Sequence, residues 1–128
     1  MTPKNHKDLA FFQAAYDTYK KFPEHIQDDG GYQLDQLQRG LEPADFKPLI
    51  RVGSGAYELR LDDETNEYRV VYVAKLDNKV WVLHAFQKKT RTTRDSDIES
   101  AKDAYDALVK MLHKEKVSQK KQRKEPRN

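Results

Sequence analysis

The chain has 128 residues, no cysteine, 35% charged residues and a mean hydropathy of −1.01. That length suits one domain with its own core, and the lack of thiols excludes disulfides, thiolate zinc sites and a cysteine nucleophile. The net charge is +3, but residues 114–128 alone carry +5, which leaves −2 on residues 1–113. No apolar run reaches the roughly 20 residues of a membrane span, and the N-terminus lacks the apolar core of a secretory signal, so we expect a soluble cytoplasmic protein.

The first half of the chain predicts helices followed by a loop. Over residues 6–21, apolar side chains recur at spacings of three and four, at Leu9, Phe12, Tyr16 and Tyr19, which is typical of one helix face. A second helix is predicted from Pro23 to Arg39, with Gly40 as its cap and a glycine pair in the middle that could divide it. Residues 41–55 hold two prolines and two glycines and are predicted to form a connecting loop.

The second half predicts three strands and a final helix. The segments 56–61, 68–76 and 79–86 are rich in Val, Tyr, Leu and Trp, and short Asx-containing turns separate them, which is typical of an antiparallel meander. Ser96 and Glu99 have the spacing of a capping box, and apolar residues then recur at helical spacing as far as Leu112. We therefore expect an α+β fold in one domain over residues 1–113, whose last helix has about four turns, followed by a basic, disordered tail over residues 114–128.

The turns predict which side chains share a sheet face. Closing the first hairpin around residues 63–66 places Arg60 opposite Arg69, and closing the second at Asp77-Asn78 places Phe86 opposite Arg69 and His84 opposite Val71. Strand alternation then puts these residues on one face, with Lys88 continuing the row. The other face, predicted to carry the helices, holds Tyr57, Leu59, Leu61, Val70, Tyr72, Trp81 and Leu83.

Two hypotheses explain the predicted pair of arginines. Like charges directly across a ladder are destabilising, so the pair needs either an anionic ligand or neighbouring carboxylates, for which Glu58, Asp62 and Glu67 are the candidates. The first hypothesis gains support from the run Lys88, Lys89, Arg91 and Arg94, which follows the last strand without an acidic residue. A phosphate backbone is the anion that such a face would fit.

Other residues have simple structural alternatives. His84 lies within an apolar strand, where a partly buried structural histidine is more common than a catalytic one. The four histidines show no metal-ligand spacing, and the sequence has no Walker loop, nucleophile elbow or dinucleotide fingerprint. The basic tail is either a solvated end or a nonspecific nucleic-acid contact whose affinity would fall with salt.

Several segments together resemble the RelE/HigB superfamily of toxins from bacterial toxin–antitoxin modules, in its phage-derived HigB-like branch. They are YELRL at 57–61, EYRVVY at 67–72 and VLHAFQKKT at 82–90, followed by a capped helix, with KKFP at 20–23 and GLEPADFKPL at 40–49 upstream. The resemblance implies N-terminal helices on one side of an antiparallel sheet and an open, basic face on the other. This branch usually opens with a short edge strand, whereas residues 1–19 here have a helical pattern.

The resemblance also implies a function, namely ribosome-dependent cleavage of mRNA in the A site and inhibition by a helix-turn-helix antitoxin. RNA supplies its own 2′-hydroxyl nucleophile, so the protein has to orient the phosphate, stabilise charge and move protons, without a metal or cofactor. By motif, Arg60 and Arg69 are expected to bind phosphate, and Lys88 or Lys89 to transfer a proton, with His84 as the alternative base. The rival functions are a ParE-type toxin that targets gyrase and a noncatalytic RNA-binding or degenerate phage-related module.

Overall fold

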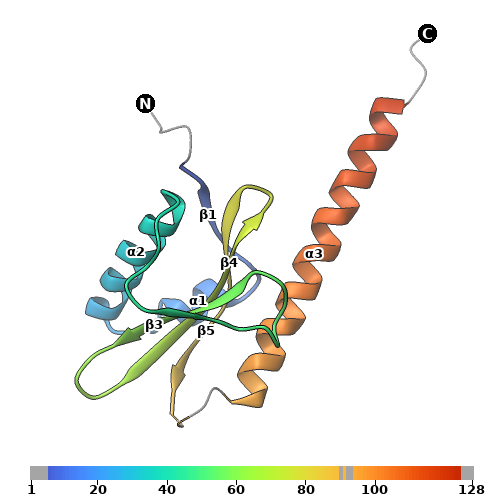
Figure 1. Ribbon diagram of the computed structural model, residues 1–128. Helices are drawn as coiled ribbons and strands as arrows, with labels where there is room; N and C mark the ends of the chain where they lie inside the picture. The colour runs from blue at the N-terminus through green and yellow to red at the C-terminus, as the bar shows by residue number, and fades with distance from the viewer. Residues whose placement is uncertain (1–5, 90, 92–93, 125–128) are drawn as a thin grey trace.

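The computed structural model describes residues 6–89, 91 and 94–124. Five strands form one mixed sheet in the order β1-β5-β4-β3-β2, and three helices pack around it (Figure 1). In chain order the elements are β1 (Asp8–Phe11), α1 (Ala15–Tyr19), α2 (Glu24–Gln38), β2 (Phe46–Pro48), β3 (Ala56–Asp62), β4 (Glu67–Leu76), β5 (Lys79–Lys88) and α3 (Asp95–Lys124). The predicted α+β class is confirmed.

The N-terminal segment corrects the predicted helix over residues 6–21. Residues 8–11 form an edge strand that runs parallel to β5, and the helix begins only at Ala15. Leu9 and Phe11 pack against one core cluster while Ala10 and Phe12 pack against the other, which is the alternation of a strand. The helical spacing was therefore coincidental, and the edge strand that seemed to be missing is present.

The second helix and the loop after it follow the prediction in part. Helix α2 is continuous through its glycine pair, and Gly40 lies just beyond its end at a φ of +78°, where glycine is favoured. The predicted loop over residues 41–55 contains the short strand β2, which pairs with β3 and forms an edge of the sheet. Two prolines had argued against a strand here, but an edge strand tolerates proline at its outer side.

The meander is confirmed with its main pairings, including Arg60 opposite Arg69, Phe86 opposite Arg69 and His84 opposite Val71. Between the second turn and His84, however, two compensating irregularities interrupt the β4–β5 ladder. They reverse the expected face of Trp81 and Leu83, both of which pack toward α3. The prediction for these two residues was wrong because a bulge cannot be seen from turn spacing alone.

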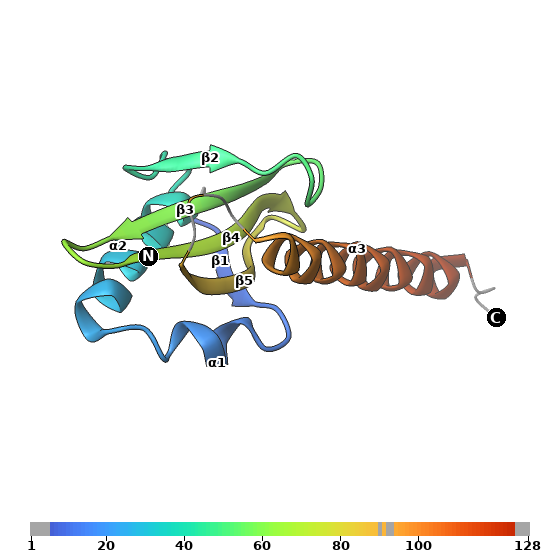
Figure 2. The same ribbon diagram turned by 90° about the horizontal axis from the view of Figure 1, so that it is seen from below.

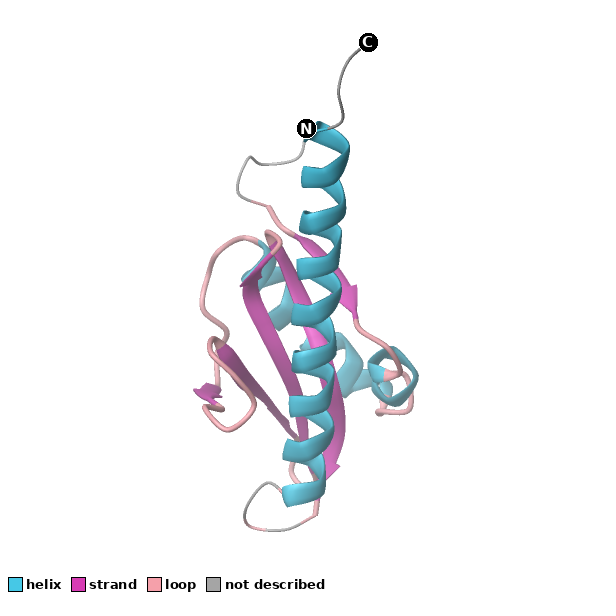
Figure 3. Cartoon of the chain, turned by 90° about the vertical axis from the view of Figure 1, so that its right-hand side faces the viewer, coloured by secondary structure: helices cyan, strands magenta, loops and turns pink. Residues whose placement is uncertain are grey.

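Helices cover both faces of the sheet. The α1 and α2 side holds one core cluster, around Leu34, Leu59 and Val70, and the α3 side holds the other, around Trp81, Leu83 and Leu108. Figure 3 shows α3 in front of the sheet with the shorter helices behind it. The face expected to be fully open is thus partly covered by α3.

Helix α3 differs from the prediction at both ends. The Arg94 carbonyl accepts hydrogen bonds from the Asp97 and Ile98 backbone amides, so the helix begins before Ser96 and the predicted capping box is not its N-cap. The helix has 30 residues, far more than four turns, and continues through most of the basic segment to Lys124. Within the described ranges, no helix combines the length and apolarity that crossing a bilayer requires.

Candidate functional site

Polar side chains lie in three rows across the face of the sheet that α3 covers only in part. Because facing residues in adjacent strands point to the same side, the pairings define these rows. The first row is Lys47, Glu58, Val71 and His84, the second is Arg60, Arg69 and Phe86, and the third is Asp62, Glu67 and Lys88. The residues predicted to share a face therefore do share it, and β2 adds Lys47.

Arg69 is almost fully buried, with 2% of its surface exposed. Among the charged residues of this face, Glu58 alone is more buried. Its guanidinium donates hydrogen bonds to the Asp62 carboxylate at 2.6 Å, the Glu67 carboxylate at 3.2 Å and the Tyr68 carbonyl at 2.9 Å. Its Nε lies 3.4 Å from Glu58. The carboxylates considered as balancing charges thus surround Arg69.

Glu58 is completely buried in the middle of three cations. Its Oε1 lies 3.4 Å from Arg69 Nε, 3.7 Å from Lys47 Nζ and 4.0 Å from Arg60 Nε. A buried carboxylate is tolerated only when it is paired, and Glu58 in turn screens the two facing arginines from each other. The centre of this face is therefore a balanced ionic network.

Arg60 is the more accessible of the two arginines. A third of its side chain is exposed, and its nearest carboxylate oxygens, on Asp45 and Glu58, lie at 3.9 and 4.0 Å. Its Nε is buried and makes no hydrogen bond to any described residue. Loose ion pairs of this length leave the outer guanidinium nitrogens able to bind an incoming phosphate.

His84 is held by a carboxylate that the sequence analysis did not identify. Its Nε2 lies 2.9 Å from Asp97 Oδ1 in the first turn of α3, and its ring stacks on Phe86 with centroids 5.4 Å apart. If Nε2 carries the proton that Asp97 accepts, Nδ1 keeps a lone pair, which is how general bases are oriented in many hydrolases. A cavity of about 250 Å³ between α1 and α3 opens beside the ring, lined in part by Thr18 and Ser100.

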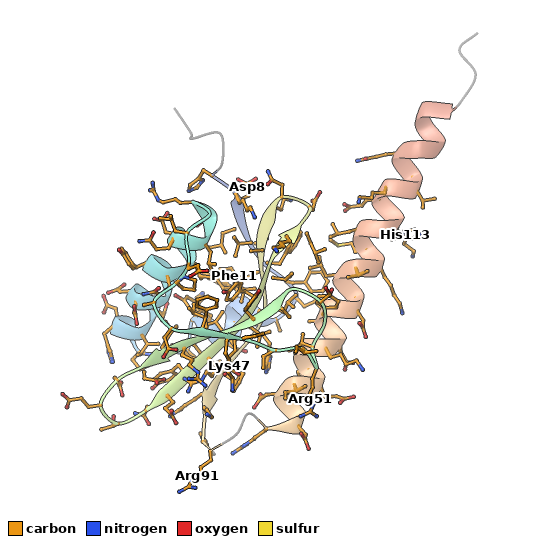
Figure 4. The ribbon with its side chains drawn as sticks, in the orientation of Figure 1. Asp8, Phe11, Lys47, Arg51, Arg91 and His113 are labelled. Carbon is orange, nitrogen blue, oxygen red and sulfur yellow. The ribbon has the colours of Figure 1, made fainter. Side chains whose placement is uncertain are left out.

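The lysines at the end of β5 lie at the edge of the face. Lys88 is half-buried opposite Glu67, and Lys89 and Arg91 are exposed. Figure 4 shows Arg91 directed away from the body, beyond the end of β5, whereas Lys47 lies on the edge strand β2, opposite Glu58. Lys88 and Arg91 are close in sequence, but Lys88 belongs to the third row and Arg91 does not.

Asp97 and Lys47 are the site residues that the sequence analysis missed. Asp97 reaches His84 only because α3 folds back over the sheet, and Lys47 joins the rows only because β2 pairs with β3. Asp97 belongs to no motif named above, and the segment GLEPADFKPL, which contains Lys47, gave that lysine no role. Among the described residues, no cluster of three or more His, Asp or Glu side chains could hold a metal ion.

Comparison with known proteins agrees with the resemblance at the level of the family. No curated protein matches this chain significantly. The family model of the phage-derived Gp49-like proteins (DUF891) matches residues 17–106, more than two thirds of the chain, including both arginines, His84 and Asp97. The chain therefore belongs to the phage-derived Gp49-like family, which is a family of RelE-like toxins.

Proposed function

We propose that the protein is the toxin of a type II toxin–antitoxin module and cleaves mRNA in the A site of the ribosome. One observation supports this proposal beyond the family itself. Arg60, His84 and Lys88 lie in three adjacent rows of one sheet face, beside the buried ionic network of Glu58 and Arg69. Such an arrangement supplies a phosphate ligand, a base and an acid without a covalent step on the protein.

The proposed reaction uses the RNA's own nucleophile. His84 Nδ1 takes the proton from the ribose 2′-hydroxyl, and the 2′-oxygen forms a bond to the adjacent phosphorus as the bond to the 5′-oxygen breaks. Lys88 or Lys89 gives a proton to that leaving oxygen, which yields a 2′,3′-cyclic phosphate and a 5′-hydroxyl. Arg60 binds the nonbridging oxygens, where negative charge accumulates.

Asp97 and Arg69 act through other groups in this scheme. Asp97 is a positioning residue that fixes the tautomer of His84 through the 2.9 Å contact. Arg69 pairs with Asp62, Glu67 and Glu58. Because Glu58 and Asp62 belong to β3, these ion pairs help to hold the strand that carries Arg60. Direct contact of Arg69 with phosphate would require the substrate to displace Asp62 and Glu67, which are both partly exposed.

A primer-extension assay tests the proposal, with purified protein added to ribosomes stalled on a defined mRNA and naked mRNA as control. We expect cuts confined to the A-site codon. His84→Gln and Arg60→Ala should each lower the cleavage rate by about 10² or more, and Lys88→Ala with Lys89→Ala should do so jointly. Lys21→Ala, an exposed lysine before α2, is the matched control and should cut normally. Unchanged cleavage in the His84 and Arg60 variants would refute the assigned roles.

A noncatalytic RNA-binding protein is the second candidate, and the engagement of Arg69 by three carboxylates favours it. If no RNA is cut, Asp62→Asn with Glu67→Gln provides the next test, because it removes two of the three carboxylates that hold the guanidinium. Tighter RNA binding by that variant would make Arg69 a latent phosphate ligand, and unchanged binding would leave it structural. DNA breaks without RNA cleavage would indicate the gyrase-targeting alternative instead.

The toxin assignment also implies a partner. A toxin of this class is produced with an antitoxin that binds and silences it, and the resemblance suggests a small helix-turn-helix protein. Copurification of the chain with the product of the adjacent gene, and loss of growth arrest when both are expressed, would support that assignment.

A further inference from the structure

The C-terminal half of α3 leaves the body of the protein. Leu112 is the last buried residue in the part of the helix whose burial is described, and every residue from 113 to 119 is exposed. Figure 1 shows this part of the helix projecting past the sheet, Figure 2 shows it extending to one side, and Figure 4 places His113 at its base. We call residues 113–124 the α3 extension.

The α3 extension is strongly basic. Its sequence, HKEKVSQKKQRK, holds six lysines and arginines and one acidic residue, Glu115. Helical ion pairs form at spacings of three and four, and at those spacings Glu115 has Met111, Leu112, Ser118 and Gln119, none of them basic. The charge is therefore not neutralised within the helix.

Like charges within the extension oppose its helical state. The segment continues a helix that is already nucleated on the core, and its lysines and glutamines favour helix, but like charges four residues apart, such as Lys116 and Lys120, are destabilising. The other 116 residues carry a net −2, so the basic charge is concentrated on the projecting segment. Both features favour an anionic partner outside the protein.

We propose that the α3 extension is an arm that binds the phosphate backbone of a structured RNA, at a place separate from the RNA that is cut. About 27 residues separate Asp97 from Lys124, which corresponds to about 40 Å of helix, or roughly twelve base pairs of a duplex. One codon cannot span that distance. On the proposed function, which this step rests on, the bound RNA is ribosomal RNA near the A site.

Two other anionic partners fit less well. A helix that lies on a membrane needs an apolar face, and Val117 is the one large apolar residue of the extension. An acidic protein groove would bind through burial of apolar side chains as well as charge, which a single valine does not provide. Binding to a phosphate backbone requires only the positive charge and the length of the α3 extension.

The test compares two variants of the full-length protein with equal loss of charge. The arm variant is Lys116→Gln, Lys120→Gln and Lys121→Gln, and the control is Lys20→Gln, Lys21→Gln and Lys102→Gln, whose wild-type lysines are exposed on other parts of the structure. Glutamine keeps helix propensity close to that of lysine, which circular dichroism checks. The probes are purified 30S subunits without mRNA, a 20-base-pair RNA hairpin, and vesicles containing phosphatidylserine.

We expect the arm variant to bind 30S subunits and the hairpin about tenfold more weakly than the wild type, and the slope of log K against log salt to fall by about two to three. The control variant should bind like the wild type. Equal binding by both variants, equal loss in both, no RNA binding by the wild type, or loss confined to vesicles would each overturn the proposal. Because no step of this assay measures cleavage, an arm that binds RNA in a protein that cuts none would refute the proposed function alone.

Discussion

At the residue scale, the facing arginines show how a charge conflict in the sequence is resolved. Arg60 and Arg69 are directly opposite each other in the ladder, as the turns predicted, and Glu58 lies against both. Of the two sequence hypotheses, neighbouring carboxylates account for Arg69, while Arg60 has a side chain that is one-third exposed and only loosely paired. One buried acid thus allows one arginine to be structural and the other to face solvent.

Glu58→Gln tests that interpretation. The substitution keeps the shape of the side chain but leaves three cations around a neutral amide, so we expect a loss of about 3 kcal/mol in the free energy of unfolding. Urea denaturation measures the loss, with Glu64→Gln, an exposed acid in the β3–β4 turn, as the control. A Glu58→Gln protein as stable as the control would mean that the carboxylate does not hold the network together.

Sequence alone predicted part of this site. The turns fixed which residues share a face because the two ladder irregularities cancel before His84. Asp97 was not predictable, since its contact with His84 depends on how α3 packs, which no local spacing encodes. The same holds for Lys47, whose strand has only three residues.

At the scale of elements, the N-terminal segment shows where periodicity is ambiguous. Leu9 and Phe12 fit a helix, while Leu9 and Phe11 on one side with Ala10 and Phe12 on the other fit a strand. Pairing with β5 decides the outcome, and a distant partner cannot be seen in a local pattern. Helix α2 was predictable because its signals at both ends are local.

The glycine pair in α2 offers a matched test of packing against propensity. A Cβ on Gly30 would lie 2.6 Å from the Tyr19 hydroxyl and 3.1 Å from Leu61, whereas a Cβ on Gly31 would meet nothing within 4 Å. We expect Gly30→Ala to destabilise the protein by about 1 to 3 kcal/mol and Gly31→Ala to stabilise it by up to about 1 kcal/mol. Thermal unfolding of both variants measures the two effects, and shifts of the same sign would show that α2 packs differently against α1.

At the scale of the whole molecule, α3 divides into two parts with different roles. Its first half fills the second core cluster with Ile98, Ala101, Ala104, Leu108 and Leu112, and it supplies Asp97 to His84. Its second half has no buried side chain among residues 113–119. In the sequence, the end of the apolar spacing at Leu112 and the start of the basic run fall at the same place, but they could not show that the helix continues to Lys124.

Ending the chain after His113 should therefore leave the fold almost unchanged. The truncation removes no buried side chain among the described residues, so we expect the free energy of unfolding to change by less than about 1 kcal/mol. Ending it after Ala101 is the contrasting case, because it removes Leu108 and Leu112, whose loss at about 2 to 5 kcal/mol each approaches the total stability of a small domain. Urea denaturation of the two shortened proteins measures both effects. A marked loss of stability in the protein that ends after His113 would mean that the α3 extension supports the body. Unchanged stability would mean that the fold does not require the extension, so that its basic character has to be explained by what it binds.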